Sequence, residues 1–443
     1  MTSPDGATPR FLYPVFASGL HDAAAVDQLT TPVRGVLDQL DGRLVGGVDG
    51  VGGVDGVDGV DGVDGVDGVD GVGAGDVPML YVIATGGTER SVLDAIAERR
   101  VTHGDEVVTL VAHRAHNSLP AALETLAAIH QHGGRGRIVF VTGDSDADAH
   151  RLDEAVRDAE AIARFRSTRL GVVGGPSSWL VASSPAAEVV RRRWGPELVI
   201  VEPTRMIELT RVPVVPTGAL AERFTKVADP TRTTVDARAV SDAMGVRSAL
   251  ADVLDDHALD AVTVRCFDLL GDPGTSGCLA LASLNDDGIV AGCEGDVPST
   301  LAMLLVRHLL DQPSWMANPA TVDVDENRLG LAHCTVAPSM LDGFALDTHF
   351  ESGKGVGISG HFASQPVTLL RLGGSDLDEC WIVEGDIVDT GDDPDLCRTQ
   401  VTVALSSGHV RELLERPLGN HIVLASGHHE ERLRRWWALA VAH

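Results

Sequence analysis

Hydrophobic and polar positions follow one rhythm over the middle of the chain. From Pro78 onward, short apolar runs alternate with stretches whose apolar residues recur at helical spacing. Buried strands that alternate with amphipathic helices are typical of parallel sheets with helices on both faces. The pattern therefore predicts an α/β fold for most of the chain. The runs expected to form strands cover 79–84, 106–112, 137–142, 170–173, 198–202, 261–267 and 278–283.

The rhythm changes after about residue 329. Short apolar runs follow one another closely, with turn residues between them and little helix, which favours antiparallel β structure of the sandwich or barrel type. These runs cover 329–336, 355–359, 367–372, 380–388, 400–404 and 421–425, and a helix is expected over 429–441. We therefore expect an N-terminal α/β domain (1–166), a central α/β domain (167–328) and a β-rich C-terminal domain (329–443).

A low-complexity segment interrupts the first domain. Residues from about 45 to 76 repeat valine, aspartate and glycine with a period of three. Glycine loses much conformational entropy when it is ordered, and the valines are too sparse to form a core. We predict a disordered surface insertion. The alternative, a calcium-binding β-roll, would need a nine-residue glycine–aspartate pattern that is absent here.

One stretch of the central domain combines an apolar pattern with polar chemistry. The run 288–293 precedes a helical pattern, in which Asp296 can cap the N-terminus and Pro298 fits the first turn. A second apolar run begins at 314–317. We interpret the whole stretch as a βαβ unit whose two strands are parallel neighbours.

Polar side chains follow both strands of this predicted unit. Glu294 and Asp296 come directly after the first strand, and Asn318 follows the second. Open parallel sheets bind their ligands at the carboxyl edge, so these side chains are expected to converge. The alternative is that they serve only as a helix cap and as turn residues.

Composition narrows the classes of partner. The net charge is −29, and lysine occurs only at Lys226 and Lys354. An acidic, lysine-poor surface suits a salty cytosol of the halophile type and argues against nucleic acid or anionic membranes as partners. No apolar run approaches the ~20 residues of a membrane span, and no secretory signal is evident, so a cytoplasmic location is expected.

The cysteines and one glycine-rich turn offer weaker signals. None of the six cysteines forms a CxxC pair, so buried free thiols are expected, although Cys293 beside Glu294 could also be a nucleophile or a soft metal ligand. The turn 174–178 precedes another expected helix and could hold a phosphate. It lacks a GxGxxG or a GxxxxGK[ST] pattern, however, so a nucleotide site is not favoured.

Three clusters in the second half could carry chemistry. Their oxygen and imidazole ligands suit a divalent ion such as Mn²⁺ better than a thiolate-bound zinc ion. Lys354, one of two lysines in the chain, lies in a glycine-rich loop of the second cluster. It either has a specific function there or is present by chance. The clusters contain Glu294, Asp296 and Asn318; His333, His349, Glu351 and Lys354; and His421, followed by His428 and His429.

Several of these motifs together resemble L-fucose isomerase and the related L-arabinose isomerase-like proteins. The resemblance rests on Glu294-Gly295-Asp296 with the following helix, on Ala317-Asn318, and on Gly419-Asn420-His421 with Gly427-His428 before a final helix. It extends less specifically to 117–120 and 175–178. It implies two Rossmann-like, doubly wound parallel-sheet domains, a β-rich C-terminal domain and a homo-oligomer, either a trimer or a hexamer.

The resemblance also implies a metal-dependent isomerase acting on a fucose- or arabinose-like monosaccharide through an enediol. By motif, Mn²⁺ would be bound by Glu294, by His421 and at position 318, where the family has an aspartate and this chain has Asn318. An amide cannot accept a proton, so Glu294 would act alone unless Asp296 or Glu351 assists.

The remaining candidates and the alternatives complete these expectations. His333 and His349 are candidates for substrate binding, and Lys354 is a further catalytic candidate. The alternatives are another metal-assisted reaction on a sugar derivative, such as that of a lyase or an epimerase, and a catalytically inactive sugar-binding paralogue.

Overall fold

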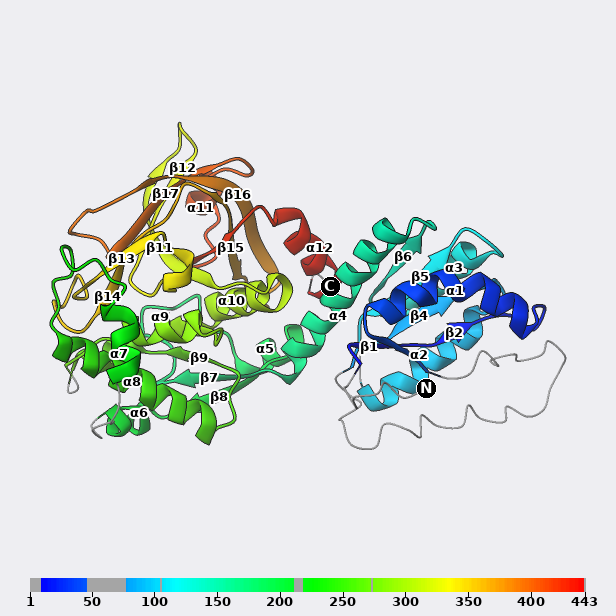
Figure 1. Ribbon diagram of the computed structural model, residues 1–443, viewed down its shortest axis with the longest axis horizontal. Helices are drawn as coiled ribbons and strands as arrows, with labels where there is room; N and C mark the ends of the chain where they lie inside the picture. The colour runs from blue at the N-terminus through cyan, green and yellow to red at the C-terminus, as the bar shows by residue number, and fades with distance from the viewer. Residues whose placement is uncertain (1–8, 46–76, 104–105, 211–217, 272–273, 442–443) are drawn as a thin grey trace. The chain divides into compact units, whose positions relative to one another are not determined.

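The computed structural model of the chain describes residues 9–45, 77–103, 106–210, 218–271 and 274–441 (Figure 1). The chain forms two compact units, Met1–Arg164 and Phe165–His443. The predicted Val-Asp-Gly insertion lies almost entirely outside the described residues. No helix among the described residues is long and apolar enough to cross a membrane.

The first unit is a layered α/β structure. Its main sheet has the parallel order β2-β4-β5-β6, and β1 pairs with β3 beside it. Buried residues of α1 and α4 pack on one face of the sheet, and those of α2 and α3 pack on the other. The elements are β1 (Phe11–Tyr13), β2 (Val15–Phe16), α1 (Ala23–Gln39), β3 (Gly42–Leu44), β4 (Leu80–Ile83), α2 (Glu89–His103), β5 (Val108–His113), α3 (Ser118–Gln131), β6 (Gly136–Val141) and α4 (Ser145–Ser167).

The second unit begins with another parallel sheet. Its strand order is β10-β9-β7-β8, and α9 and α10 pack against β10. The predicted alternation of strands and helices is confirmed for both parallel sheets. The elements are β7 (Arg169–Val173), α5 (Ala187–Arg193), β8 (Glu197–Val201), α6 (Pro203–Thr210), α7 (Gly218–Thr225), α8 (Ala237–Asp256), β9 (Ala261–Val264), η1 (Cys266–Leu270), α9 (Cys278–Asp286), β10 (Ala291–Cys293) and α10 (Val297–Leu310).

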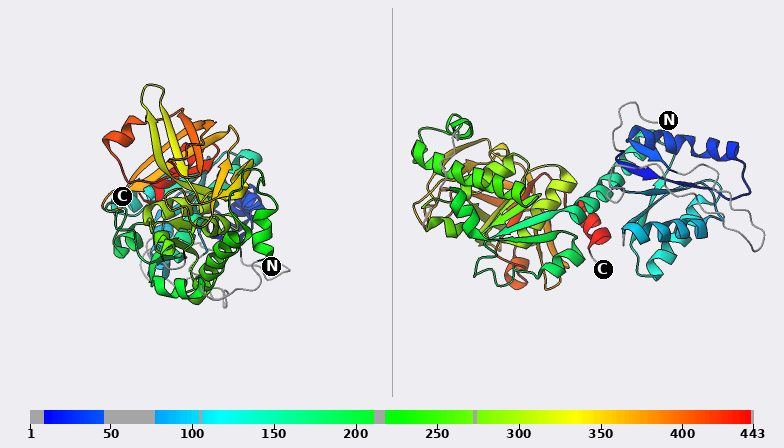
Figure 2. Two further views of the ribbon diagram at one scale, coloured as in Figure 1. Left: turned by 90° about the vertical axis from the view of Figure 1, so that its left-hand side faces the viewer. Right: turned by 90° about the horizontal axis from the view of Figure 1, so that it is seen from below.

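A closed six-stranded barrel follows in the same unit (Figures 1 and 2). Its order is β11-β12-β17-β16-β15-β18, and every pair is antiparallel, as the spacing of apolar runs predicted. Strands β13 and β14 pair antiparallel in a separate two-stranded sheet. The elements of this part of the chain are β11 (Ser314–Asp323), β12 (Arg328–His333), η2 (Pro338–Met340), β13 (Gly343–Asp347), β14 (Gly357–His361), β15 (Pro366–Gly373), β16 (Glu379–Thr390), β17 (Thr399–Leu405), α11 (Arg411–Glu415), β18 (Ile422–Ser426) and α12 (Glu430–Ala440).

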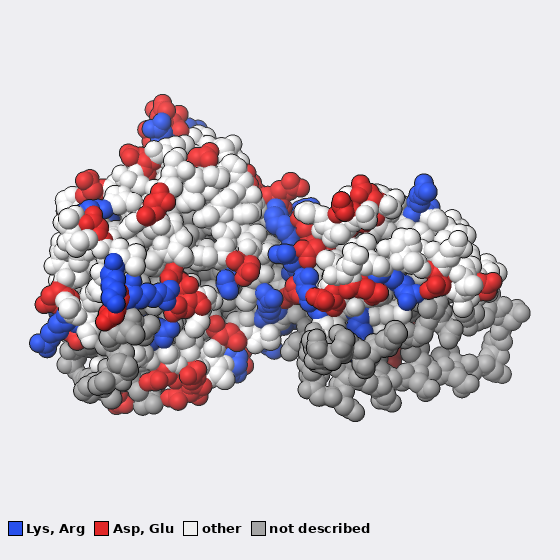
Figure 3. Space-filling view, viewed as in Figure 1, with Lys and Arg blue, Asp and Glu red and all other residues white. Residues whose placement is uncertain are grey.

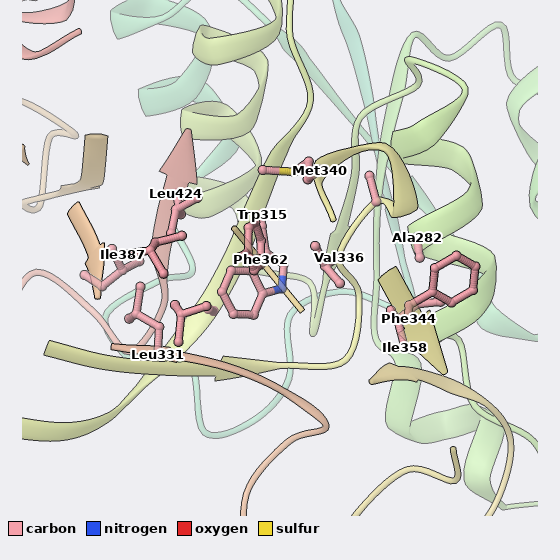
Figure 4. Close-up of a cluster of buried hydrophobic side chains, with 14 of the residues drawn as sticks. Ala282, Trp315, Leu331, Val336, Met340, Phe344, Ile358, Phe362, Ile387 and Leu424 are labelled. Atoms are coloured by element: carbon pink, nitrogen blue, oxygen red, sulfur yellow. The ribbon is translucent and has the colours of Figure 1, made fainter. Parts of the chain in front are cut away.

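One large apolar core holds the barrel to its neighbours. It joins Trp315 and Leu424 from barrel strands with Phe344 of the β13–β14 hairpin and Ala282 of α9 (Figure 4). Helix α10 packs against β9 and β10 on one side and against β11, β15 and β18 on the other. The parallel sheet and the barrel are thus joined through α10, and burial of apolar surface stabilises the junction.

The prediction of a βαβ unit over 288–318 is wrong in one respect. Helix α10 forms as expected, with Asp296 accepting a hydrogen bond from the Ser299 N–H and Pro298 in the first turn. The strand after it, however, leaves the parallel sheet and pairs antiparallel with β12 and β18 in the barrel. Its first four residues are buried, and a short buried run does not reveal which sheet it joins. Asn318 consequently lies within β11 and not beyond a strand end.

Two smaller expectations are also corrected. The run 278–283 was expected to form a strand but forms the helix α9, which is buried on all sides and therefore has no polar face to show a helical period. The segment after 174–178 consists of turns, and the next helix, α5, begins only at Ala187.

The six cysteines are free, and all except the half-buried Cys380 are buried, as predicted. The Cys293 sulfur lies 3.0 Å from that of Cys266, and this contact together with burial raises the pKa of the Cys293 thiol. A neutral, buried thiol favours the core role over the nucleophile. At the surface, Figure 3 shows acidic side chains spread among basic ones over the visible face of each unit.

The contact of β10 with α10 gives a test of the fold. A Cβ atom on Gly292 would overlap the Thr300 hydroxyl of α10, so Gly292→Ala should lower the free energy of unfolding by about 1–3 kcal/mol. The matched control is Gly245→Ala inside α8, where no atom lies within 4 Å, and it should raise stability by about 0.5–1 kcal/mol. Urea unfolding measures both, and equal shifts of the same sign would contradict this packing.

Candidate active site

The site is built on the turn that follows β10. Glu294 has a φ of 62° and Gly295 a φ of 74°, so two successive residues occupy the left-handed region. That region is costly for a glutamate and requires support from its surroundings. The loop after β7 supplies it, because the Ser177 N–H donates to the Glu294 carbonyl oxygen at 2.8 Å and a Cβ on Gly295 would overlap the Gly175 carbonyl oxygen.

The glycine-rich turn considered above for phosphate binding thus has a different place in the structure. Its glycine and serine backbone packs against the turn that presents Glu294, and Trp179, next on the same loop, donates its Nε1–H to Glu294 Oε2 at 2.6 Å. The loop therefore binds the carboxylate of Glu294, where the sequence had suggested a phosphate.

A buried ion pair lies directly behind this turn. Arg371 on β15 reaches Asp296 with Nη1–Oδ distances of 3.0 and 3.3 Å, and both side chains are at most 1% exposed. The other Arg371 partners are the Ser183 and Ser299 hydroxyls and the Leu418 carbonyl oxygen. A Cβ on Gly419 would overlap the guanidinium, so only glycine fits there.

Asp296 in turn orients His421. The Asp296 Oδ2 atom lies 2.9 Å from His421 Nδ1, while Oδ1 caps α10. Both carboxylate oxygens of Asp296 are therefore engaged, and the imidazole is held with Nε2 directed away from the pair. A carboxylate on the distal nitrogen is the usual support of a metal-binding histidine.

Three side chains meet on the far side of His421. Glu294, His333 and His421 are all buried, and one ligand atom from each lies within 4.8 Å of the other two. The His421 Nε2 atom is 3.7 Å from Glu294 Oε1, and the rings of His333 and His421 are 5.6 Å apart. His333 ends β12, and the Thr335 hydroxyl lies 3.0 Å from its Nδ1.

The protonation states follow from burial and charge. Burial alone would lower the pKa of His421, but the hydrogen bond to Asp296 and the charges of Asp296 and Glu294 raise it to about 9. Burial, and then the neighbouring His421 charge, lowers the pKa of His333 to about 4. Burial raises the pKa of Glu294, but the nearby charged His421 ring and the hydrogen bond from the Trp179 N–H outweigh it and bring the pKa below its ordinary value.

This group fits a divalent metal ion. Two ligands about 2.1 Å from one ion lie roughly 3–4.2 Å apart, and the 3.7 Å between His421 Nε2 and Glu294 Oε1 falls in this range. The His421 Nε2 atom is buried and has no hydrogen-bond partner among the described residues, as expected of an atom that an ion would occupy. One carboxylate and two imidazoles suit ions such as Mn²⁺, Fe²⁺ or Zn²⁺.

Asn318, expected as a metal ligand, lies beside this group in the backbone register. It pairs with Ala332, which precedes His333, and its neighbour Ala317 pairs with Ile422, which follows His421. No described residue makes a hydrogen bond with its side-chain amide. Asn318 is thus between the two histidines along the sheet, while the third member of the close group is His333, which was expected to bind substrate.

The remaining candidates lie on the segment between β13 and β14. His349 is buried, with its ring 5.6 Å from that of Phe267, and its backbone N–H donates to the Lys354 carbonyl oxygen. The Lys354 ammonium is exposed and donates to the Leu270 carbonyl oxygen at 2.8 Å. Glu351 is exposed at the turn. None of the three belongs to the Glu294–His333–His421 group.

Sequence reasoning missed Arg371 and Trp179. Arg371 sits in the apolar run 367–372, and a charge inside a strand that is otherwise buried was the available signal, because a buried arginine needs an acidic partner. Trp179 follows the glycine-rich turn, and nothing in its local pattern indicates a contact with Glu294.

Comparisons with known proteins point to sugar isomerases. No protein-family model matches the chain. It is 24% identical over 269 residues to a sulfoquinovose isomerase of Clostridium sp. (strain MSTE9), a match that covers 58% of this chain and 59% of that protein. Sulfoquinovose isomerases of Alkalicoccus urumqiensis (21% over 287 residues, 58% and 59% covered) and Priestia aryabhattai (25% over 119 residues, 23% and 27% covered) are also similar.

These matches support the expected resemblance to sugar isomerases in general. The relatives' printed name differs from the fucose and arabinose isomerases to which the motifs pointed. The alignment with this chain covers 59% of the length of the Clostridium protein and 59% of the length of the Alkalicoccus protein.

The buried ion pair gives a prediction for stability. Arg371→Met would leave the Asp296 charge buried without its cation, so the free energy of unfolding should fall by about 3–5 kcal/mol. The control is Arg192→Met, which removes an exposed pair with Asp376 and should change stability by less than about 0.5 kcal/mol. Urea unfolding of both variants decides, and a loss below about 1 kcal/mol for Arg371→Met would contradict this role.

Proposed function

We propose that the protein is a divalent-metal-dependent aldose–ketose isomerase, in which Glu294, His333 and His421 hold the ion. The observation that supports this most directly is the buried three-residue group, with ligand atoms within 4.8 Å of one another and the His421 Nε2 atom unpaired. The similarity to proteins named sulfoquinovose isomerase supports the reaction class. Mn²⁺ is the ion that we favour.

Isomerisation moves one proton from C2 to C1 of the sugar and one hydroxyl proton from O2 to O1. A bound divalent ion would lower the barrier by polarising the two substrate oxygens. Glu294 is the residue that we assign to the carbon-bound proton, because its carboxylate is ionised and Oε1 has no hydrogen-bond partner among the described residues. It accepts the proton from C2, which leaves an enediolate, and it returns this proton to C1 after the hydroxyl proton has moved from O2 to O1.

Asp296 has a supporting role in this proposal. Its two oxygens are used by the Ser299 N–H, Arg371 and His421, so it orients the imidazole and does not accept a substrate proton. Asn318 also lacks basicity. A single carboxylate therefore carries the proton between the two carbons. The L-fucose isomerase family, which the motifs resemble, has both a glutamate and an aspartate for this step.

The substrate that we propose is a monosaccharide. The motifs favour a fucose- or arabinose-like sugar, and the relatives' name favours a sulfonated aldohexose. For a charged substrate, Lys354 is a candidate partner, because its exposed ammonium lies on the turn that also carries His349. The Rossmann-like character of the parallel sheets, a trimeric or hexameric assembly and a cytoplasmic location belong to the same proposal.

Activity on a panel of aldoses tests the reaction. Purified full-length protein with Mn²⁺ should form a ketose from sulfoquinovose, L-fucose or L-arabinose, and Glu294→Gln should lower kcat by a factor of at least about 100, as expected for loss of an acid–base group. Glu351→Gln, at an exposed position, is the matched control.

A protein that binds the metal and a sugar but converts none of the panel would contradict the isomerase. The protein would then be either an inactive sugar-binding paralogue or an enzyme for another metal-assisted reaction. Asn318, in place of the family's aspartate, is the reason to consider both. Asn318→Asp would then separate these two, because restored turnover indicates that only the second carboxylate was missing.

Metal affinity should depend on pH in one direction. His421, with a pKa of about 9, carries a proton at neutral pH, and a metal ion must displace it, whereas His333, with a pKa of about 4, is already neutral. The association constant for Mn²⁺ should thus fall about tenfold for each pH unit below about 9 and level off above it. Calorimetric titrations at several pH values measure the slope. An affinity independent of pH would show that His421 is not a ligand.

A further inference from the structure

A half-exposed tryptophan borders the candidate metal site. The Trp179 side chain is 49% exposed, yet its Nε1–H donates to Oε2 of the buried Glu294 at 2.6 Å. One edge of the indole is therefore fixed at the site, and much of the remaining surface faces solvent. An indole that is fixed at the site and half exposed is thus available for contact with a ligand.

The position of this ring is well determined by its loop. Ser177, Leu180 and Ser183 are all buried, and they anchor the loop on both sides of Trp179. The Ser177 N–H donates to the Glu294 carbonyl oxygen, and the Ser183 hydroxyl contacts Arg371. The exposure of Trp179 thus occurs on a segment that is tied to the same two residues that organise the site.

Trp179 also begins a row of aromatic rings. Its ring meets Phe267 at 5.1 Å in a T-shaped contact, and Phe267 meets His349 at 5.6 Å in a second one. The three rings come from the loop after β7, from η1 and from the segment after β13. A wall of rings beside convergent polar groups is the usual composition of a small-molecule site.

We propose that Trp179 has two functions: it stacks on the apolar C–H face of the bound sugar, and it positions Glu294. The hydrogen bond occupies Oε2 and so leaves Oε1, the oxygen nearest His421 Nε2, for the ion and the substrate. The substrate class that this ring selects is a sugar with one face free of hydroxyl groups. The inference rests on the proposed function, since it assigns the substrate-facing wall of the same site.

Two variants separate the two functions of Trp179. Trp179→Phe keeps an aromatic face but loses the N–H, so kcat should fall about 10- to 100-fold, the range of one hydrogen bond to a charged group, while KM changes little. Trp179→Ala removes the ring as well, so KM should also rise about tenfold. The control is Val181→Ala on the same loop, where a side chain that is 90% exposed makes no assigned contact, and its kinetics should equal those of the wild type.

A spectroscopic measurement distinguishes stacking from a structural effect. Adding the sugar to the Mn²⁺-loaded wild type should change tryptophan fluorescence, and the change should be lost in Trp179→Phe although calorimetry still detects sugar binding. A wild-type KM in Trp179→Ala, or a fluorescence change that persists in Trp179→Phe, would overturn the proposal.

The outcome remains informative if the isomerase proposal fails. If no aldose is converted, binding of sulfoquinovose and L-fucose to the Mn²⁺-loaded protein is measured by calorimetry. Binding that is weakened about tenfold in Trp179→Ala and unchanged in Val181→Ala supports the stacking role without any turnover. Equal binding in the wild type and Trp179→Ala, or no binding of either sugar to the wild type, overturns it.

Discussion

The buried pair of Asp296 and Arg371 is the interaction on which the site depends. It joins the N-terminus of α10, at the edge of the parallel sheet, to strand β15 of the barrel, and neither side chain reaches solvent. Transferring two charges from water is costly, so the pair survives only because serine hydroxyls, a carbonyl oxygen and the His421 ring complete its hydrogen bonds. The same contacts orient His421, so the packing that joins the sheet to the barrel also positions the imidazole.

The electrostatics of the site follow from that arrangement. Two buried carboxylates face one imidazole, which therefore holds a proton at neutral pH, while His333 beside it stays neutral. A divalent cation in place of that proton would meet an ionised Glu294 and two neutral nitrogens. Because Asp296 is paired with Arg371, the ionised Glu294 would offset one of the two charges of a divalent ion, and this carboxylate is already buried and oriented without the ion, as a preorganised site requires.

Much of the fold could be predicted because its determinants are local. The cap at Asp296, Pro298 in the first turn and the leucines of α10 lie close together in the sequence. Five of the six short apolar runs after 329 match barrel strands, and the run 355–359 forms β14, which pairs with β13 outside the barrel. The sheet that β11 joins could not be predicted, because a buried run of four residues has the same pattern in a parallel sheet and in a barrel. Helix α9 was mistaken for a strand because every side of it is covered.

The same distinction applies to the site. Glu294 and His421 were found through short motifs, but the contact of His333 with them depends on the closure of the barrel, which no local pattern encodes. Arg371 and Trp179 act over sequence separations of 75 and 115 residues. The charge of Arg371 inside an apolar run could indicate a buried acidic partner, but the identity of that partner, like the contact of Trp179, depends on the folded chain.

The central claim is that Glu294, His333 and His421 share one cation. The most direct measurement is the anomalous diffraction of crystals of the Mn²⁺-loaded protein, recorded near the manganese absorption edge. We expect a single strong peak about 2.1–2.3 Å from Glu294 Oε1 and from one ring nitrogen of each histidine, the separations typical of such ligands. A peak elsewhere, or none in crystals whose solution counterpart binds Mn²⁺, would contradict the account.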